Sequence, residues 1–147
     1  MDVNYREITK TDYNKCAEVL VSAYAGEPWN NVWTIEEALL RVEATMSGVN
    51  ARGFVAVIDG EVMAQCLGRI DYYNENWNQF CVDECSILAD FQGKGIGTIL
   101  MNFVSESLKQ EEIDRIWLLT GGEMAVKFYE KNGFKVSNEG TMMTLEL

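Results

Sequence analysis

Apolar residues recur with helical spacing at several points along the chain, and these stripes predict amphipathic helices. After Thr11, a suitable N-cap, four apolar residues fall at i, i+3, i+4 and i+7: Cys16, Val19, Leu20 and Ala23. A second helix is expected after Thr34, where Glu37 completes a capping box. A third helix with a long apolar stripe is expected from Ile96, and a short fourth helix over residues 122–131.

Between these helices lie short apolar or alternating runs that predict strands. The expected strands cover residues 4–8, 53–58, 61–72, 79–88, 113–119, 134–137 and 142–147. Asp59-Gly60 separates two of them with a typical hairpin sequence. The order β-α-α-β-β-β-α-β-α-β-β fits an α/β (α+β) fold with a mixed, mostly antiparallel central sheet flanked by helices. Because there is no linker or repeat, residues 1–147 are expected to form a single domain.

The composition narrows the chemistry that this chain can perform. It has 23 acidic residues, 12 Lys plus Arg and no histidine, so its formal net charge is −11. Without histidine, neither a His-containing catalytic triad nor an imidazole zinc site can form, and no metal site is expected. The acidity argues against nucleic acid or an anionic membrane surface as a partner, because both are negatively charged and bind proteins through clusters of Lys and Arg. A cationic partner would be attracted instead.

The chain has no apolar run of the roughly 18 residues that a membrane helix needs, and residues 1–6 contain no apolar signal core. A cytoplasmic location is therefore expected. In that compartment the four cysteines, Cys16, Cys66, Cys81 and Cys85, are expected to be free buried thiols. The sequence does not fix the oligomeric state, and a homodimer is one option.

A glycine-rich turn over residues 88–98 joins an expected strand to an expected helix. Gly93, Gly95 and Gly97 let backbone N–H groups converge without Cβ obstruction, and the helix adds its positive end. The pattern favours a phosphate-binding loop, although a tight turn without a ligand would use the same residues. It is not a dinucleotide fingerprint, because Thr98 replaces the last glycine, and not a P-loop, because its Gly-Lys pair is followed by glycine.

Two motifs in this order resemble the Gcn5-related N-acetyltransferase (GNAT) superfamily. Gln92, Gly95 and Gly97 match its acetyl-CoA-binding Q-x-x-G-x-G motif, and residues 125–134 match its A-x-x-F-Y-x-x-x-G-F signature. The order of the expected elements is also similar to that of the family, so the resemblance spans nearly the whole chain. A proline common before the loop and an asparagine common before the second motif are replaced by Ala89 and Gly122.

The resemblance implies a GNAT-like fold that uses acetyl-CoA as cosubstrate. Loop amides would hold the CoA pyrophosphate with added charge from Lys94, and main-chain groups of Ile87 and Leu88 would pair with the pantetheine arm in a splay between two strands. The residues expected to contact the cosubstrate are Ile87, Leu88, Gln92, Gly93, Lys94, Gly95, Ile96, Gly97, Thr98 and Phe128.

The same resemblance implies the catalytic roles. Tyr129 occupies the family's general-acid position and would protonate the leaving sulfur. Glu84 matches the place of an acidic residue that acts as a base through water, and Asp83 is the other candidate; binding alone could also deprotonate the amine. Strand alternation predicts that Asp83 and Glu84 point to opposite faces, with Glu84 on the face of Val82 and Ser86.

Two aromatic loops, residues 27–33 and 72–77, are expected to line the acceptor side. Aromatic faces and carboxylates suit a cationic amine, and the expected acceptor contacts are Glu27, Trp29, Tyr72 and Asp83. The expected function is transfer of an acetyl group from acetyl-CoA to a primary amine of a small, cationic acceptor, by direct attack in a ternary complex. The alternative is a non-catalytic acyl-CoA-binding sensor or scaffold. A structural protein with a vestigial site is a third class.

Overall fold

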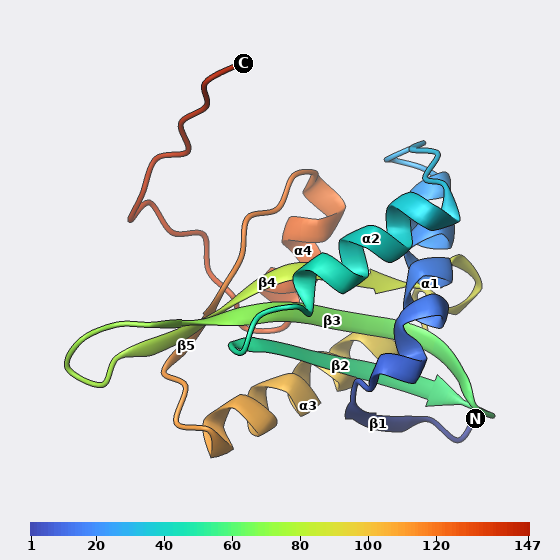
Figure 1. Ribbon diagram of the computed structural model, residues 1–147, viewed down its shortest axis with the longest axis horizontal. Helices are drawn as coiled ribbons and strands as arrows, with labels where there is room; N and C mark the ends of the chain where they lie inside the picture. The colour runs from blue at the N-terminus through green and yellow to red at the C-terminus, as the bar shows by residue number, and fades with distance from the viewer.

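The computed structural model describes all 147 residues as a five-stranded sheet with four α-helices (Figure 1). The strands are β1 (Asn4–Glu7), β2 (Ala51–Ile58), β3 (Glu61–Tyr72), β4 (Asn78–Ile87) and β5 (Arg115–Trp117). The helices are α1 (Tyr13–Ala25), α2 (Ile35–Thr45), α3 (Ile96–Gln110) and α4 (Glu123–Lys131), with 3₁₀ turns η1 (Lys10–Asp12) and η2 (Ala89–Phe91). All four predicted helices are present, and Thr34 and Glu37 form the predicted capping box. No helix is both long enough and apolar enough to cross a membrane.

The strands lie in the order β1-β2-β3-β4-β5. Neighbouring strands from β1 to β4 are antiparallel. Hairpins join β2 to β3 and β3 to β4, whereas α1 and α2 lie between β1 and β2. β4 and β5 are parallel, with α3 connecting them. This arrangement confirms the predicted mixed, mostly antiparallel sheet flanked by helices.

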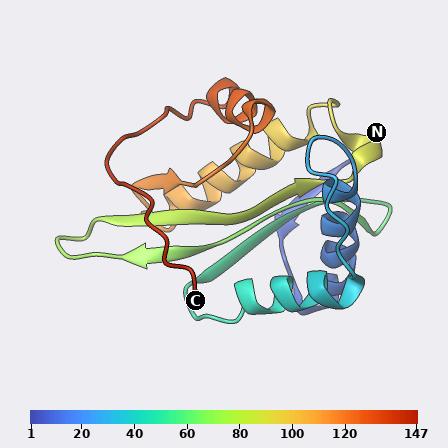
Figure 2. The same cartoon turned by 90° about the horizontal axis from the view of Figure 1, so that it is seen from above.

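The sheet separates two layers of helices (Figure 2), with α1 and α2 on one face and α3 and α4 on the other. Alternation along β2 supplies both cores, since Phe54 packs in the cluster under α3 and Val55 in the cluster under α1. The predicted stripe of α3 is buried at Ile96, Leu100 and Val104. The four cysteines are free, and Cys85 is the only one that is half-buried rather than buried.

One extra residue in β4 breaks the regular pairing with β3. Leu67 lies opposite Glu84 and Gly68 lies opposite Val82, so Asp83 has no partner and forms a β-bulge. Gly68 makes the bulge possible, because a Cβ there would collide with the carbonyl oxygen of Cys81. Val82 packs in the cluster under α3, whereas the Glu84 side chain meets Arg41 of α2 on the opposite face.

The bulge corrects the expectation of simple alternation in β4. The Asp83 side chain contacts Arg69, which lies opposite Cys81, and Glu84 lies opposite Leu67, a member of the cluster under α1. Asp83 and Glu84 therefore face the same side of the sheet, and Val82 does not share it. A single inserted residue cancels one step of the alternation, and the sequence alone gives no sign of it.

The two strands predicted at 134–137 and 142–147 are not formed, and this part of the prediction is wrong. Residues 134–147, called the tail below, have no strand assignment, and in Figure 1 the tail leaves the body of the molecule. The alternating sequence is present, but a strand forms only where its N–H and C=O groups pair with a neighbouring edge. The strand predicted at 113–119 is also shorter, because β5 covers only Arg115–Trp117.

Candidate active site

The candidate site begins at an opening between β4 and β5. The strands pair over three residues only, with Gln79–Cys81 opposite Arg115–Trp117. Beyond Cys81, β4 continues to Ile87 with no strand on that side. The pairing thus ends in the region where the sequence resemblance implies a splay between the two strands.

The direction of main-chain groups at the end of β4 follows from its antiparallel pairing with β3. The Leu88 N–H donates to the carbonyl of Met63 at 2.8 Å, so Ile87, one residue earlier, presents its N–H and C=O to the open side. There the Ile87 carbonyl accepts from Gln92 Nε2 at 3.1 Å. The Leu88 carbonyl accepts from the N–H of Phe91 at 2.8 Å. Ile87 therefore offers an N–H to an extended ligand, while both main-chain groups of Leu88 are engaged within the chain.

The glycine-rich loop follows directly and ends at the first turn of α3. Gly93 and Gly95 have φ values of 74° and 82°, the left-handed region that favours glycine. No atom lies within 4 Å of a Cβ position at either residue, so the loop borders open space. The first N–H groups of α3, from Ile96 to Thr98, have no partners within the helix and point toward this space together with the positive end of the helix dipole. The Ile96 side chain is buried in the core, so only its main chain can serve a ligand.

Gly97 has a different role from the other two loop glycines. A Cβ at Gly97 would lie 2.7 Å from Ile87 Cδ1 and 3.0 Å from Phe128 Cε1. The missing side chain therefore lets α3 approach both β4 and α4 and places the Phe128 ring beside the loop. Lys94 lies over the ring of Phe91, with Nζ 5.2 Å from its centroid, and is the one cation of the loop.

Tyr129 lies on α4 in an aromatic cluster. Its ring meets Phe128 and Phe134 edge to face, with centroid distances of 5.2 and 5.3 Å. Burial, followed by the charge and hydrogen bonding of Cys85, raises the pKa of Tyr129 well above its usual value. The hydroxyl is therefore protonated at neutral pH and available as a hydrogen-bond donor beside the Cys85 thiol.

Glu84 is the most buried carboxylate near the opening, with 4% of its surface exposed. Oε1 accepts a hydrogen bond of 2.9 Å from the Tyr24 hydroxyl, and Oε2 accepts one of 3.0 Å from Arg41 Nε. Arg41 also donates to the carbonyl of Asp83 at 2.7 Å and so holds the bulge. Burial and the neighbouring Glu84 carboxylate raise the pKa of Tyr24 above its usual value. Both oxygens of Glu84 thus accept a hydrogen bond, Oε1 from Tyr24 and Oε2 from Arg41.

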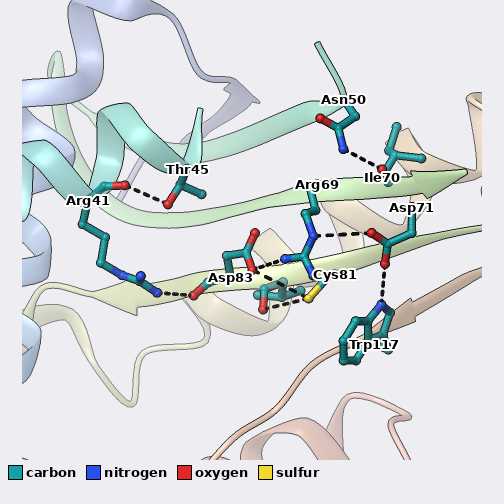
Figure 3. A network of polar contacts seen from close by, with 10 residues as sticks. Arg41, Thr45, Asn50, Arg69, Ile70, Asp71, Cys81, Asp83 and Trp117 are labelled. Atoms are coloured by element: carbon teal, nitrogen blue, oxygen red, sulfur yellow. Dashed lines mark hydrogen bonds and ion pairs between the residues drawn. The ribbon is translucent and has the colours of Figure 1, made fainter. Parts of the chain in front are cut away.

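Asp83 belongs to a second network on the same face (Figure 3). Arg69 contacts the Asp83 carboxylate at 2.5 Å and the Asp71 carboxylate at 3.4 Å, and Asp71 accepts from Trp117 Nε1 at 3.1 Å. Two carboxylates therefore share one guanidinium. Beside them lies a cavity of about 220 Å³ lined by Arg69, Cys81, Val82, Asp83, Trp117 and Leu119.

The two aromatic loops expected on the acceptor side do not meet. Trp29 packs edge to face on Tyr24 at 5.6 Å, and its Cη2 lies 3.8 Å from a Cβ position at Gly122, so the loop before α2 reaches the start of α4. Glu27 is exposed on this loop. Tyr72 is the last residue of β3, five residues or about 17 Å along the strand from Leu67, the partner of Glu84. Figures 1 and 2 show the β3–β4 hairpin extending away from the helices at this end.

Three further residues join the site without having been predicted: Tyr24, Arg41 and Cys85. Tyr24 and Arg41 reach Glu84 across 60 and 43 residues of sequence, a separation that no local pattern encodes. One signal was available, because Arg41 is the single basic residue of α2 in a helix with three acids. No group of three or more Cys, Asp or Glu side chains is placed to hold a metal ion.

Comparison with known proteins agrees with this geometry. The model of the acetyltransferase (GNAT) family matches residues 14–134. No curated protein matches the chain.

Several solved structures share the fold. A possible acetyltransferase from Clostridium difficile 630 has a TM-score of 0.82 at 17% identity, over 99% of this chain and 98% of that one. AAC(6')-Iy, solved in complex with the bisubstrate analog CoA-S-monomethyl-acetylneamine, has a TM-score of 0.76 at 16% identity over 100% of both chains. A ribosomal-protein-alanine N-acetyltransferase from Brucella melitensis biovar Abortus 2308 has a TM-score of 0.75 at 17% identity over 99% of both chains. The family match covers both motifs and all of β4 and β5, and the chain therefore belongs to the acetyltransferase (GNAT) family.

Proposed function

We propose that this protein transfers the acetyl group of acetyl-CoA to the primary amine of a small, cationic acceptor in a ternary complex. The observation that carries the proposal is the convergence of three features at one opening. The loop amides at the start of α3 follow the unpaired edge of β4, and Tyr129 interacts with Cys85 on that same part of β4. These supply an anion cradle, a strand edge for an extended arm and a proton donor.

The donor fits this opening in an extended form. The pyrophosphate would bind at Gly93, Gly95 and the first amides of α3, with Lys94 nearby as the only loop cation. The pantetheine arm would pair with the Ile87 N–H, and Phe128 would contact it beside Gly97. Because Leu88 has both main-chain groups engaged, the pairing falls on Ile87 rather than on both residues.

The proton chemistry falls on tyrosines, because the chain has no histidine. As the amine nitrogen bonds to the acetyl carbon and the C–S bond breaks, Tyr129 donates a proton to the sulfur. The proton released by the amine goes to Glu84 through Tyr24, whose hydroxyl already donates to Oε1 at 2.9 Å. Glu84 then acts as a base through the Tyr24 hydroxyl and does not contact the amine itself. This role is compatible with the hydrogen bonds that both of its oxygens already accept.

The acceptor would enter on the face of the sheet that carries Trp29 and Asp83. Trp29 offers an aromatic face to a cation. Arg69 pairs with two carboxylates, those of Asp71 and Asp83, so this group of three side chains has a net negative charge that would attract a cationic amine. Tyr72 lies too far along β3 to take part within one chain. Of the aminoglycoside acetyltransferases among the structural neighbours, one was solved in complex with sisomicin, which supports a small amine as the acceptor class. We further propose that the chain acts as a single cytoplasmic domain, with neither nucleic acid nor a membrane as partner.

Tyr129→Phe tests the proposal, with Tyr73→Phe in an exposed loop as the matched control. We expect the Tyr129 variant to lose turnover by about 10²-fold or more, while calorimetry shows unchanged acetyl-CoA affinity. The assay is release of the CoA thiol across a library of small amines.

The outcomes separate the candidate functions. Unchanged turnover in Tyr129→Phe removes the proton-donor role. Acetyl-CoA binding without turnover on any amine favours the non-catalytic acyl-CoA-binding sensor or scaffold. A failure to bind acetyl-CoA at micromolar concentration refutes both.

A further inference from the structure

Cys66 of β3 and Cys85 of β4 lie directly opposite each other in the sheet. The Leu88 N–H donates to the carbonyl of Met63, so those two opposite residues form a hydrogen-bonded pair, and pair types alternate along an antiparallel ladder. Cys66 and Cys85, three positions along, therefore form a non-hydrogen-bonded pair. This is the type whose Cα atoms lie closer, at about 4.5 Å, with the side chains side by side.

Both thiols belong to the core on the α3 face of the sheet. Cys66 is a buried member of the cluster there, and Cys85 packs against the same cluster. Opposite Cβ atoms in a non-hydrogen-bonded pair lie about 4.5 Å apart, and a disulfide needs them about 3.5–4.5 Å apart. A small approach of the two strands would join the sulfurs, and a bond formed with such strain is easily reduced.

The two thiols differ in access and in acidity. Cys66 is fully buried, whereas Cys85 is half-buried and lies beyond Cys81, where β4 no longer pairs with β5. Hydrogen bonding with Cys66 lowers the pKa of Cys85 despite its burial, and Tyr129 adds to this effect. Hydrogen bonding with Cys85, followed by burial, raises the pKa of Cys66 well above its usual value. Cys85 is therefore the thiol that is reached and ionised first, with Cys66 against it.

We propose that Cys66 and Cys85 form a thiol–disulfide exchange site that reacts with small-molecule disulfides and closes to a cross-strand disulfide. The Cys85 thiolate attacks one sulfur of the small disulfide, whose S–S bond breaks. One half stays on Cys85 as a mixed disulfide, and the other leaves as a thiolate and takes up a proton. Cys66 then gives up its proton and attacks the Cys85 sulfur, which releases the second half as a thiol. The two cysteines lose two electrons and two protons, and the small disulfide is reduced to two thiols.

The bond would also change the surroundings of Tyr129. In the reduced chain the Cys85 thiol is a hydrogen-bonding neighbour of the Tyr129 hydroxyl. In the disulfide the Cys85 sulfur is bonded to Cys66 and has no thiol proton or thiolate charge, so this contact is lost. Oxidation should therefore lower acetyl transfer. This effect on turnover rests on the proposed function, whereas formation of the disulfide does not.

The test incubates the folded wild-type chain with oxidised glutathione, stops exchange with acid, blocks the free thiols and maps linked peptides by mass spectrometry. We expect a disulfide between Cys66 and Cys85, with Cys16 and Cys81 still free, and its complete loss after treatment with dithiothreitol. Free thiols at all four cysteines would overturn the proposal, as would a disulfide that joins any other pair. This measurement needs no variant to fold.

Two single variants test the order of the steps. In Cys66→Ala the Cys85 thiol has no partner to resolve it, so glutathione should remain on Cys85. In Cys85→Ala the buried Cys66 should stay a free thiol. Cys81→Ala is the matched control, because Cys81 lies on the same strand opposite Arg69 and its loss should leave the disulfide unchanged. Glutathione on Cys66 in Cys85→Ala would refute the assigned order.

Turnover with acetyl-CoA and the amine library is measured on the same oxidised and reduced samples. We expect at least about a tenfold loss in the oxidised chain, recovered with dithiothreitol. Equal turnover in both forms would refute the link to Tyr129. Absence of turnover in the reduced chain would count against the proposed function, and peptide mapping would still decide whether the exchange site exists.

Discussion

Arg41→Met isolates the contribution of the network that holds Glu84. Methionine keeps much of the length of the arginine stem but removes the donors to Glu84 Oε2 and to the Asp83 carbonyl. Glu84, with 4% of its surface exposed, would keep only the Tyr24 hydroxyl as a partner. A buried carboxylate that loses its cation is costly because water cannot replace the lost donors inside the protein.

The magnitude follows from the burial of the two partners. Removing one member of a fully buried ion pair costs about 3–5 kcal/mol. The Arg41 side chain is 40% exposed, so solvent screens part of this interaction, and we expect a loss of about 2 kcal/mol in the free energy of unfolding. For a chain of this size that lowers Tm by about 4–8 °C.

Urea unfolding of four proteins measures the effect: wild type, Arg41→Met, Glu84→Gln and the double variant. Removing the charge of Glu84 relieves the unpaired carboxylate, so the double variant should be more stable than the sum of the single losses by about 1 kcal/mol or more. Arg52→Met is the control, because Arg52 pairs at 2.9 Å with Glu111, whose side chain is 38% exposed where that of Glu84 is 3% exposed. Water can solvate the carboxylate left behind, so this variant should cost at most about 1 kcal/mol. Equal losses for Arg41→Met and Arg52→Met, or strict additivity in the cycle, would refute the reasoning.

Three further variants test the fold, one at the start of α1 and two at the glycine-rich loop. The hydrogen bond from Arg6 lowers the pKa of Asp12 from 3.8 to about 2. Because the folded pKa is the lower one, its stabilisation is present above about pH 4 and is lost as the pH falls toward 2; with Arg6 partly exposed this amounts to about 1–2 kcal/mol. Urea unfolding at several pH values in that window gives the free energy of unfolding as a function of pH. This free energy should fall less steeply with decreasing pH in Asp12→Asn than in the wild type, and an equally steep fall would contradict the assignment. Gly97→Ala should destabilise the protein by about 1–3 kcal/mol in thermal unfolding, because the new Cβ would lie 2.7 Å from Ile87 Cδ1. Gly93→Ala meets open space and should cost only the strain of its positive φ, about 1 kcal/mol; a larger loss for Gly93→Ala would reverse the roles given to the two glycines.

The features that the sequence predicted are those encoded locally. The stripe of α3, the capping box at Thr34 and the glycines of the loop each depend on residues within a turn or two of one another, so spacing alone identifies them. The parallel pairing of β4 with β5 follows from the helix between them.

The features that the sequence missed depend on distant partners or on register. Tyr24 and Arg41 reach Glu84 from two helices, and nothing in their neighbourhoods marks them as its ligands. The placement of Tyr72 was inferred from loop composition, whereas the length of the β3–β4 hairpin carries it away from Trp29. The tail has a strand pattern, but whether a strand forms depends on which edge it meets.

The inserted residue in β4 also bears on why the strands separate at all. If Asp83 were absent, Glu84 would follow Val82 directly, and the two side chains would still point to opposite faces of the sheet. The β3–β4 pairing is therefore regular except for the one inserted residue, Asp83. A bulge bends its strand and increases its local twist. The parallel pairing with β5 stops at Cys81, two residues before Asp83. One additional residue thus separates β4 from β5. A strand that would otherwise be paired along both edges keeps one edge unpaired, and that edge lines the opening.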